Sequence, residues 1–190
     1  MPRSMSDAVV FDVLHRVPLF ADTPVAELRA VARAAHTFWR QKGASVFEEG
    51  GRADGCLVLT SGRAKVVLSG ARDSEIIVGI VQPYAVLGEM ALLDDSTRSA
   101  GLVAIEKSHF IGIDRATFLE LRKNRAFEDR LVRHVTALLR RATERLRAIY
   151  TYSSTERLAW CLATLARQRG ERLGSEIAIC QDPRITSSRR

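Results

Sequence analysis

The side chains best suited to bind a ligand lie in one short segment, residues 86–100, which reads Val-Leu-Gly-Glu-Met-Ala-Leu-Leu-Asp-Asp-Ser-Thr-Arg-Ser-Ala. Gly88 lets the backbone turn tightly and approach a ligand closely, because glycine has no Cβ. Glu89 and the apolar run after it indicate one helical turn, and the first N–H groups of such a turn favour an anion. The guanidinium of Arg98 and the hydroxyl of Ser99 can neutralise and hydrogen-bond a phosphate, while the Glu89 carboxylate can accept hydrogen bonds from a sugar hydroxyl. The segment therefore predicts a nucleotide site.

This segment, which we call the cassette, resembles the phosphate-binding cassette of cyclic-nucleotide-binding domains. The resemblance extends over roughly residues 10–170, in the order found in bacterial regulators of the cAMP receptor protein/FNR type. It implies that Gly88 and Glu89 hold the ribose 2′-hydroxyl, while Arg98 and Ser99 hold the cyclic phosphate together with backbone N–H groups that follow Gly88.

Two departures from the family leave the choice of base open. In the cAMP receptor protein, adjacent Thr and Ser residues on the long helix touch the adenine, and alignment by Glu144 puts Ala142 and Thr143 at those positions. Thr143 can bond to a base edge or can face solvent, and Tyr84-Ala85 replaces the usual Gly-Asp before the cassette. The resemblance implies cAMP or cGMP as the effector, with no metal. The ligand-binding residues that we predict are Gly88, Glu89, Met90, Ala91, Arg98, Ser99 and Thr143.

Charge is divided unevenly along the chain. Residues 1–129 hold 16 Lys and Arg against 17 Asp and Glu, whereas residues 130–190 hold 13 Arg against 5 Asp and Glu, so the net +7 comes from the last third. Such an end is typical of a nucleic-acid-facing surface, or of a solvated, Arg-rich helix.

The remaining composition points to a cytoplasmic binding protein rather than an enzyme. No apolar run approaches the roughly 18 residues that span a bilayer, and no signal peptide is visible, so we expect no membrane association. The three cysteines are far apart and odd in number, which indicates reduced thiols. No catalytic set stands out, and the four histidines are isolated from one another and from the cysteines in sequence.

The cassette lies within a series of short apolar runs that glycines separate. Such runs at this spacing indicate an antiparallel barrel or sandwich. The cassette would then be held between two strands of a rigid scaffold. The predicted strands cover residues 44–47, 56–60, 64–68, 75–81, 101–105 and 110–113.

Helices are predicted on both sides of the barrel. The first covers residues 7–16; in the second, Thr23 is the N-cap and Pro24 the first helical residue. Asp114 is predicted to cap a helix over residues 115–123, and a longer helix runs over residues 127–150.

The long helix carries two apolar stripes. A coiled-coil seam with one slot interrupted by Arg145 is formed by Leu131, Val135, Leu138, Ala142 and Ile149. The flanking stripe repeats every seven residues and consists of Val132, Leu139 and Leu146. One stripe can pair with a second subunit while the other packs on the barrel, so we expect a homodimer through residues 127–150; the alternative is a monomeric core helix.

The C-terminal part resembles only the beginning of a winged helix-turn-helix domain. Residues 153–156 form a capping box for a helix that Gly170 ends, and Leu158, Leu162 and Leu165 form its apolar face. About 20 residues follow, too few for two more helices and a wing. We expect one short strand over residues 175–180 and no regular structure over 181–190.

The sequence thus predicts an α+β fold: an antiparallel, jelly-roll β-barrel of cyclic-nucleotide-binding type flanked by helices, with a long dimerisation helix and an incomplete C-terminal helical domain. The parts are residues 1–125, 126–150 and 151–190. The predicted function is a cyclic-nucleotide-sensing transcription regulator, whose full-length relatives bind DNA specifically while this chain binds it weakly and non-specifically. The alternatives are a stand-alone sensor or dimerisation module without specific DNA binding, or a regulator whose pocket uses no cyclic nucleotide.

Overall fold

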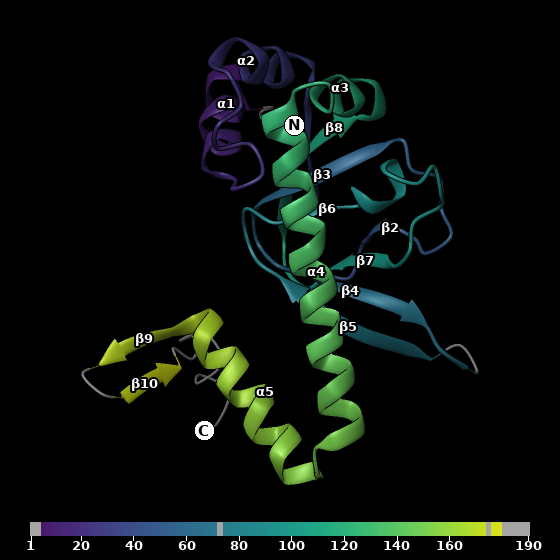
Figure 1. The fold of residues 1–190 in the computed structure, drawn as a ribbon, viewed down its shortest axis with the longest axis vertical. Coiled ribbons are helices and arrows are strands. Elements are labelled where there is room, and N and C mark those ends of the chain that lie inside the picture. The colour runs from purple at the N-terminus through teal and green to yellow at the C-terminus, as the bar shows by residue number, and fades with distance from the viewer. Residues whose placement is uncertain (1–4, 72–73, 174–175, 180–190) are drawn as a thin grey trace. The chain divides into compact units, whose positions relative to one another are not determined.

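The computed structural model describes residues 5–71, 74–173 and 176–179, with side-chain surroundings up to residue 164. The chain divides into two compact units, Met1–Val135 and Thr136–Arg190. The first unit contains an antiparallel two-sheet β core with flanking helices, so the predicted α+β class is confirmed (Figure 1).

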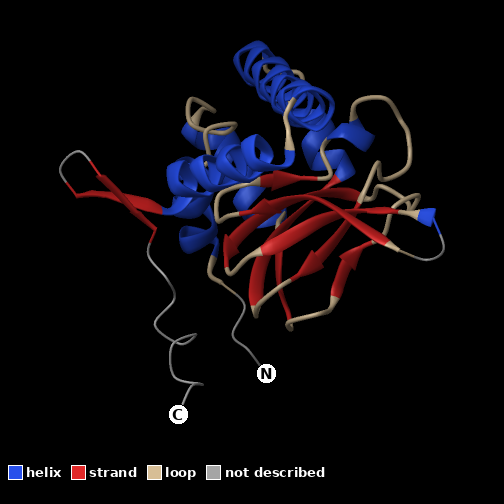
Figure 2. Ribbon diagram, turned by 90° about the horizontal axis from the view of Figure 1, so that it is seen from below, coloured by secondary structure: helices blue, strands red, loops and turns tan. Residues whose placement is uncertain are grey.

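Two four-stranded antiparallel sheets form the centre of the first unit, with strand orders β1-β8-β3-β6 and β2-β7-β4-β5. Figure 2 shows these strands gathered into one layered body. The strands are β1 (His36–Arg40), β2 (Ser45–Phe47), β3 (Gly55–Ser61), β4 (Ala64–Ser69), β5 (Glu75–Val81), β6 (Val86–Leu87), β7 (Gly101–Ala104) and β8 (Ser108–Asp114).

The alternation of β8 shows how the sequence builds two cores. Successive side chains of a strand point to opposite faces. Phe110 belongs to the hydrophobic cluster between the sheets, where it joins residues of β3, β4, β6 and β7. Ile111 and Ile113 belong to a second cluster, on the face that the helices cover. The strand is therefore apolar on both faces, which a central position requires.

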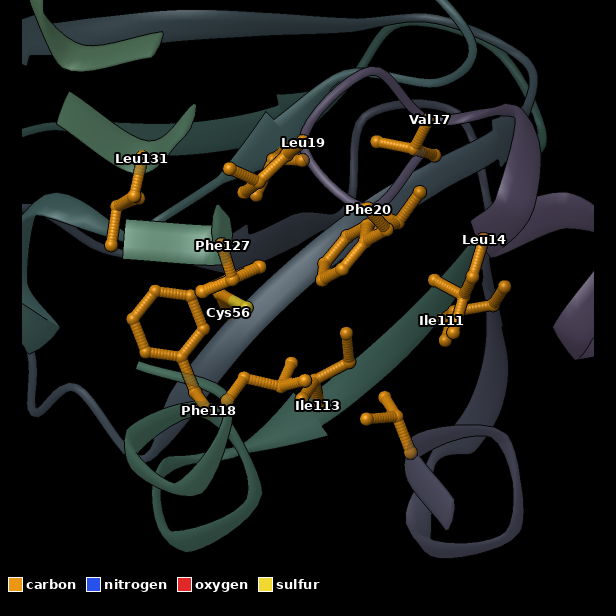
Figure 3. Packing of buried hydrophobic residues seen from close by; sticks show 14 of the residues in the cluster. Leu14, Val17, Leu19, Phe20, Cys56, Ile111, Ile113, Phe118, Phe127 and Leu131 are labelled. Carbon is orange, nitrogen blue, oxygen red and sulfur yellow. The ribbon is translucent and has the colours of Figure 1, made fainter. Parts of the chain in front are cut away.

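The second cluster joins the helices to the first sheet (Figure 3). Phe20, Phe118 and Phe127 are fully buried there, and the Phe127 ring lies 5.7 Å from that of Phe20 and 5.9 Å from that of Phe118. The first turns of the longest helix are therefore fixed to the barrel. The helices are α1 (Asp7–Arg16), α2 (Val25–Ala34), the 3₁₀ turn η2 (Met90–Leu92), α3 (Arg115–Leu121), α4 (Arg125–Thr151) and α5 (Ser154–Arg169).

Capping residues set where two of these helices begin. The Asp114 carboxylate accepts a hydrogen bond from the Thr117 N–H at 2.8 Å, which confirms the predicted cap of α3. Asn124 Oδ1 accepts from the N–H groups of Ala126 and Phe127 at 3.0 and 3.2 Å, and so fixes the start of α4. Because Asp114 ends β8, the sheet and the helical layer are joined directly.

The predicted N-cap of α2 is wrong. Pro24 has ψ 137°, an extended conformation, and its carbonyl accepts the first helical bond from the Leu28 N–H at 2.9 Å. The helix therefore begins at Val25, one residue later than predicted. The Thr23 hydroxyl oxygen is buried without a hydrogen-bond partner within the described part of the chain.

Two strands of the first unit were not predicted. The first, β1, lacks bounding glycines, and the second, β6, has only two residues, which are the first two of the cassette. Tertiary pairing defines both, because β1 lies along β8 and β6 along β3.

The exposed and buried apolar residues of α4 differ from those of the predicted seam. Leu131 is 1% exposed in the chain's own helical cluster, so it cannot join a seam with a second chain. The flanking stripe is the exposed one: Val132 is 59% exposed, Leu139 66% and Leu146 53%. Ile149, which was placed in the seam, is also exposed.

The second unit holds the end of α4, α5 and a hairpin of β9 (Gly170–Leu173) and β10 (Glu176–Ile179). The capping box is confirmed, because the Ser153 N–H donates to Glu156 Oε2 at 2.7 Å and the Glu156 N–H donates to Ser153 Oγ at 3.3 Å. The single predicted strand is corrected to a two-stranded hairpin. Leu158 and Leu162 are exposed, whereas the side chain of Leu165 and residues 181–190 lie outside the described residues.

Candidate functional site

The cassette leaves the first sheet at the end of β6 and turns at Gly88. Gly88 has φ +77°, a left-handed conformation that a residue without a Cβ adopts freely. The hydrogen bonds of the following turn begin at Leu92, whose N–H donates to the Glu89 carbonyl at 3.0 Å. The N–H groups of Met90 and Ala91 therefore have no acceptor within the turn, as expected at a helix start.

Arg98 returns to this turn from the far end of the cassette. Its N–H donates to the Gly51 carbonyl at 2.9 Å, and its carbonyl accepts from the Gly50 N–H at 2.8 Å, so its backbone is fixed. Its guanidinium donates from Nη1 to the Gly88 carbonyl and from Nη2 to the Gly55 carbonyl, both at 2.6 Å. The guanidinium carbon lies 4.6 Å from the centre of the Phe47 ring.

Arg98 is 7% exposed, and one of its side-chain N–H donors has no partner in the described part of the chain. Its Nε atom is buried and has no hydrogen-bond partner within the described residues. Burial lowers the pKa of the guanidinium, while the charges of the nearby Asp54 and Glu89 carboxylates oppose that shift. An arginine stays protonated even so, and the cassette therefore contains a buried cation.

The thiol of Cys56 lies next in sequence to Gly55, beneath the cassette. Burial raises the pKa of this thiol above its ordinary value, and the Glu89 carboxylate adds to the shift. Cys56 is fully buried and belongs to the helix-side cluster, so it is a neutral core residue.

Glu89 supplies the opposite charge. Its side chain is 3% exposed, and its Oε1 atom lies 3.2 Å from His134 Nε2 on α4. A carboxylate has two acceptor oxygens, and this contact uses one of them. The site thus combines a buried acceptor, a buried cation and N–H groups that have no acceptor within their own turn, which suits a ligand with a hydroxyl at one end and a phosphate at the other.

Comparisons with known proteins agree with this chemistry. Residues 38–125 match the family model of the cyclic nucleotide-binding domain. The chain contains a cyclic nucleotide-binding domain. A CRP-like cAMP-activated global transcriptional regulator of Mycobacterium tuberculosis is 22% identical over 172 residues, which cover 90% of this chain and 77% of that protein.

Solved structures share the fold of this cyclic nucleotide-binding domain. A cyclic nucleotide-binding domain from Methylobacillus flagellatus matches 80% of this chain and 93% of its own, with a TM-score of 0.64 and 21% identity. The regulatory domain of Toxoplasma gondii PKA, solved with cAMP, matches 70% of this chain with a TM-score of 0.63 and 22% identity. The match covers 50% of the chain of that regulatory domain.

The domain brings some of the predicted site residues together and not others. Gly88 and Arg98 are in direct contact, and Ala91 is buried in the η2 turn that follows Gly88. Ser99 is exposed, and so is Met90, at 45%. Thr143 lies in the second unit, where its hydroxyl donates to the Leu139 carbonyl at 3.0 Å.

Three residues of the domain's site were missed from sequence: Gly55, Phe47 and His134. Gly55 and Phe47 contact the guanidinium from strands that precede Arg98 by 43 and 51 residues, a distance in sequence that no local pattern bridges. His134 follows Phe127 by seven residues and so lies on the same face of α4, but the sequence did not show that this face meets the barrel.

The described residues contain no group of three or more His, Cys, Asp or Glu side chains that could hold a metal ion. Across the same residues, no helix has the length and apolar character needed to cross a membrane.

Proposed function

We propose that this chain binds cAMP or cGMP in the cassette. The ribose hydroxyl donates to Glu89, and the cyclic phosphate accepts from Arg98, Ser99 and the N–H groups that follow Gly88. One observation carries the proposal: an acid that is 3% exposed, at the start of the turn, and an arginine that is 7% exposed, which bonds to the neighbouring Gly88 carbonyl, lie in the cassette of a cyclic nucleotide-binding domain. Buried charges are costly unless a partner satisfies them, and a nucleotide offers partners for both.

Calorimetric titration with cAMP and cGMP tests the site. Arg98→Glu places a negative charge where the phosphate binds, so we expect it to abolish measurable binding. Arg52→Glu is the matched control, because it makes the same change of charge on a side chain that is 90% exposed and whose ion pair in the described structure is with Asp54 at the surface. If the unmodified chain produces no heat with either nucleotide, the proposal fails.

The base is assigned to Thr143 as part of the same proposal. Thr143 is exposed in the single chain, and its only described bond is to its own helix. A hydroxyl that bonds to a base edge distinguishes adenine from guanine, because the two bases place donors and acceptors differently. Thr143→Val is isosteric and removes this bond. It should therefore change the ratio of cAMP to cGMP affinity and leave the phosphate contacts as they are.

The chain forms a dimer through α4 in this proposal. Its exposed stripe of Val132, Leu139 and Leu146 recurs every seven residues, the spacing at which helices pair. More than half of each of these side chains is exposed in the single chain, and a second copy of the stripe would cover them.

The output is that of a regulator of the cAMP receptor protein type, in which nucleotide binding is relayed through α4 to a DNA-binding part. The net +8 of residues 130–190 supports contact with phosphate backbones. A second candidate, a sensor or dimerisation module without sequence-specific DNA binding, is favoured by one observation. In the described residues β9 follows α5 directly, where a helix-turn-helix needs a second helix.

A further inference from the structure

His134 joins α4 to the charged part of the cassette by a polar side-chain contact. Its Nε2 atom lies 3.2 Å from Glu89 Oε1, although the two residues are 45 positions apart in sequence. Both belong to the first unit. The His134 side chain is 24% exposed, whereas that of Glu89 is 3% exposed, so the histidine closes one side of the carboxylate.

The helix holds the histidine in place. Phe127 and Leu131 precede it on the same face of α4, and both are essentially inaccessible to solvent in the helix-side cluster. His134 follows Leu131 by three residues and therefore lies above it on that face. Because the two preceding turns of α4 are packed in the core, the His134 ring approaches Glu89 from one direction. Its N–H is therefore a donor with a fixed position.

A fixed donor is what a sugar-binding carboxylate needs. The terminal torsion of a glutamate is broad, so the position of its two oxygens is set by their partners. The bond to Oε1 leaves Oε2 as the acceptor for a further donor. Among the described residues, His134 is the hydrogen-bond partner of this carboxylate, and without it a buried charge would lack a directional partner.

We propose that His134 is a positioning residue for nucleotide recognition. It holds Glu89 by Oε1 so that Oε2 faces the ribose 2′-hydroxyl, and it thereby ties the sugar end of the site to α4. The inference rests on the proposed binding of a cyclic nucleotide in the cassette. It adds a residue that the cassette itself does not contain, and it makes recognition of the ribose depend on where α4 lies.

Comparison of cAMP with 2′-deoxy-cAMP isolates this role. We expect the unmodified chain to prefer cAMP by about tenfold or more, the size of one hydrogen bond to a charged acceptor. His134→Leu should remove most of this preference by weakening cAMP binding, and should leave the affinity for 2′-deoxy-cAMP nearly unchanged. His134→Gln retains an N–H donor and should keep much of the preference.

Two further variants control for structure. His134→Asn is polar but too short to reach Glu89, so it should behave like His134→Leu even if the leucine variant folds poorly. Arg133→Leu makes an equivalent change at the neighbouring exposed position of α4 and should leave the preference intact. Calorimetry measures all five proteins with both nucleotides.

The outcomes separate the two proposals. If His134→Leu and His134→Asn weaken both nucleotides equally, or if the preference for cAMP survives in them, the positioning role is overturned while nucleotide binding stands. If the unmodified chain binds neither nucleotide, the proposed function is overturned and this inference with it.

Discussion

Substitution of Gly88 by alanine tests the packing of Arg98 against the cassette backbone. Gly88 has φ +77°, a left-handed conformation that costs an L-residue about 1–2 kcal/mol. A Cβ at this position would overlap Arg98 Nη1, the atom that donates to the Gly88 carbonyl, and would lie 2.9 Å from Cζ. The guanidinium must therefore move and give up that bond, which contributes about 1.5–3 kcal/mol because the donor is charged.

Gly43→Ala is the matched control. Gly43 has φ +83°, and a Cβ there would meet nothing within 4 Å, so this variant experiences the backbone strain alone. We expect Gly88→Ala to lower the free energy of unfolding by about 1.5–3 kcal/mol more than Gly43→Ala does. Urea unfolding followed by tryptophan fluorescence measures both, provided that the slope of the transition is unchanged.

The same two variants in an Arg98→Ala background complete a double-mutant cycle. Without the guanidinium there is nothing for the new methyl group to displace, so the excess cost at residue 88 should disappear. Equal destabilisation by the two glycine variants in the native background would refute the reasoning. So would an excess that persists after Arg98 is removed, because the strain would then come from the backbone.

Three other predictions concern assembly, pH and DNA. Leu139→Glu should split the proposed dimer, because a charge buried in a helix seam is costly, whereas Ala126→Glu at an exposed position of α4 should not. Light scattering measures the mass of each protein, and a monomeric mass for the unmodified chain would contradict the dimer. Burial lowers the pKa of His109 in the folded chain. Below about pH 6.5 this histidine is therefore protonated more readily in the unfolded chain than in the folded chain, and the free energy of unfolding should fall as the pH drops through that value. His109→Gln should remove this part of the fall in urea midpoint between pH 7.5 and 5.5, and an unchanged fall would count against the assignment. In gel-shift competition, the chain should bind DNA weakly, with an affinity that falls steeply with salt and differs less than a hundredfold between a palindromic promoter fragment and random DNA; a larger preference would show base readout.

Sequence alone predicted the parts of the site that are close together along the chain. Gly88, Glu89 and Arg98 lie in one segment, and their residue types restrict the chemistry before any fold is known. The strands bounded by glycines were located for the same reason, because turns leave local signals. The contact between Glu89 and His134 has no such signal, since it depends on which turn of α4 passes the cassette.

Side-chain direction was the second kind of information that the sequence lacked. The apolar positions of α4 form two stripes, and either could have faced the barrel. Packing against Phe20 and Phe118 buries Phe127, and with it Leu131, so the other stripe is left at the surface. The phase of one helix was thus decided by three aromatic rings from separate elements.

The two charged groups of the cassette differ in what a nucleotide must do to reach them. Arg98 already donates two hydrogen bonds of 2.6 Å to carbonyls, so a phosphate that takes Nη1 or Nη2 exchanges one set of bonds for another. The phosphate then gains only the difference in free energy between its own bond to the guanidinium and the carbonyl bond that it replaces. Among the guanidinium donors, Nε has no partner in the described structure, so a bond from Nε to the phosphate would replace no existing bond. At the sugar end, His134 uses Oε1 of Glu89, so a hydroxyl that donates to the second oxygen adds a bond without displacing one. Selectivity should therefore depend on the ribose end more strongly than the number of phosphate contacts suggests.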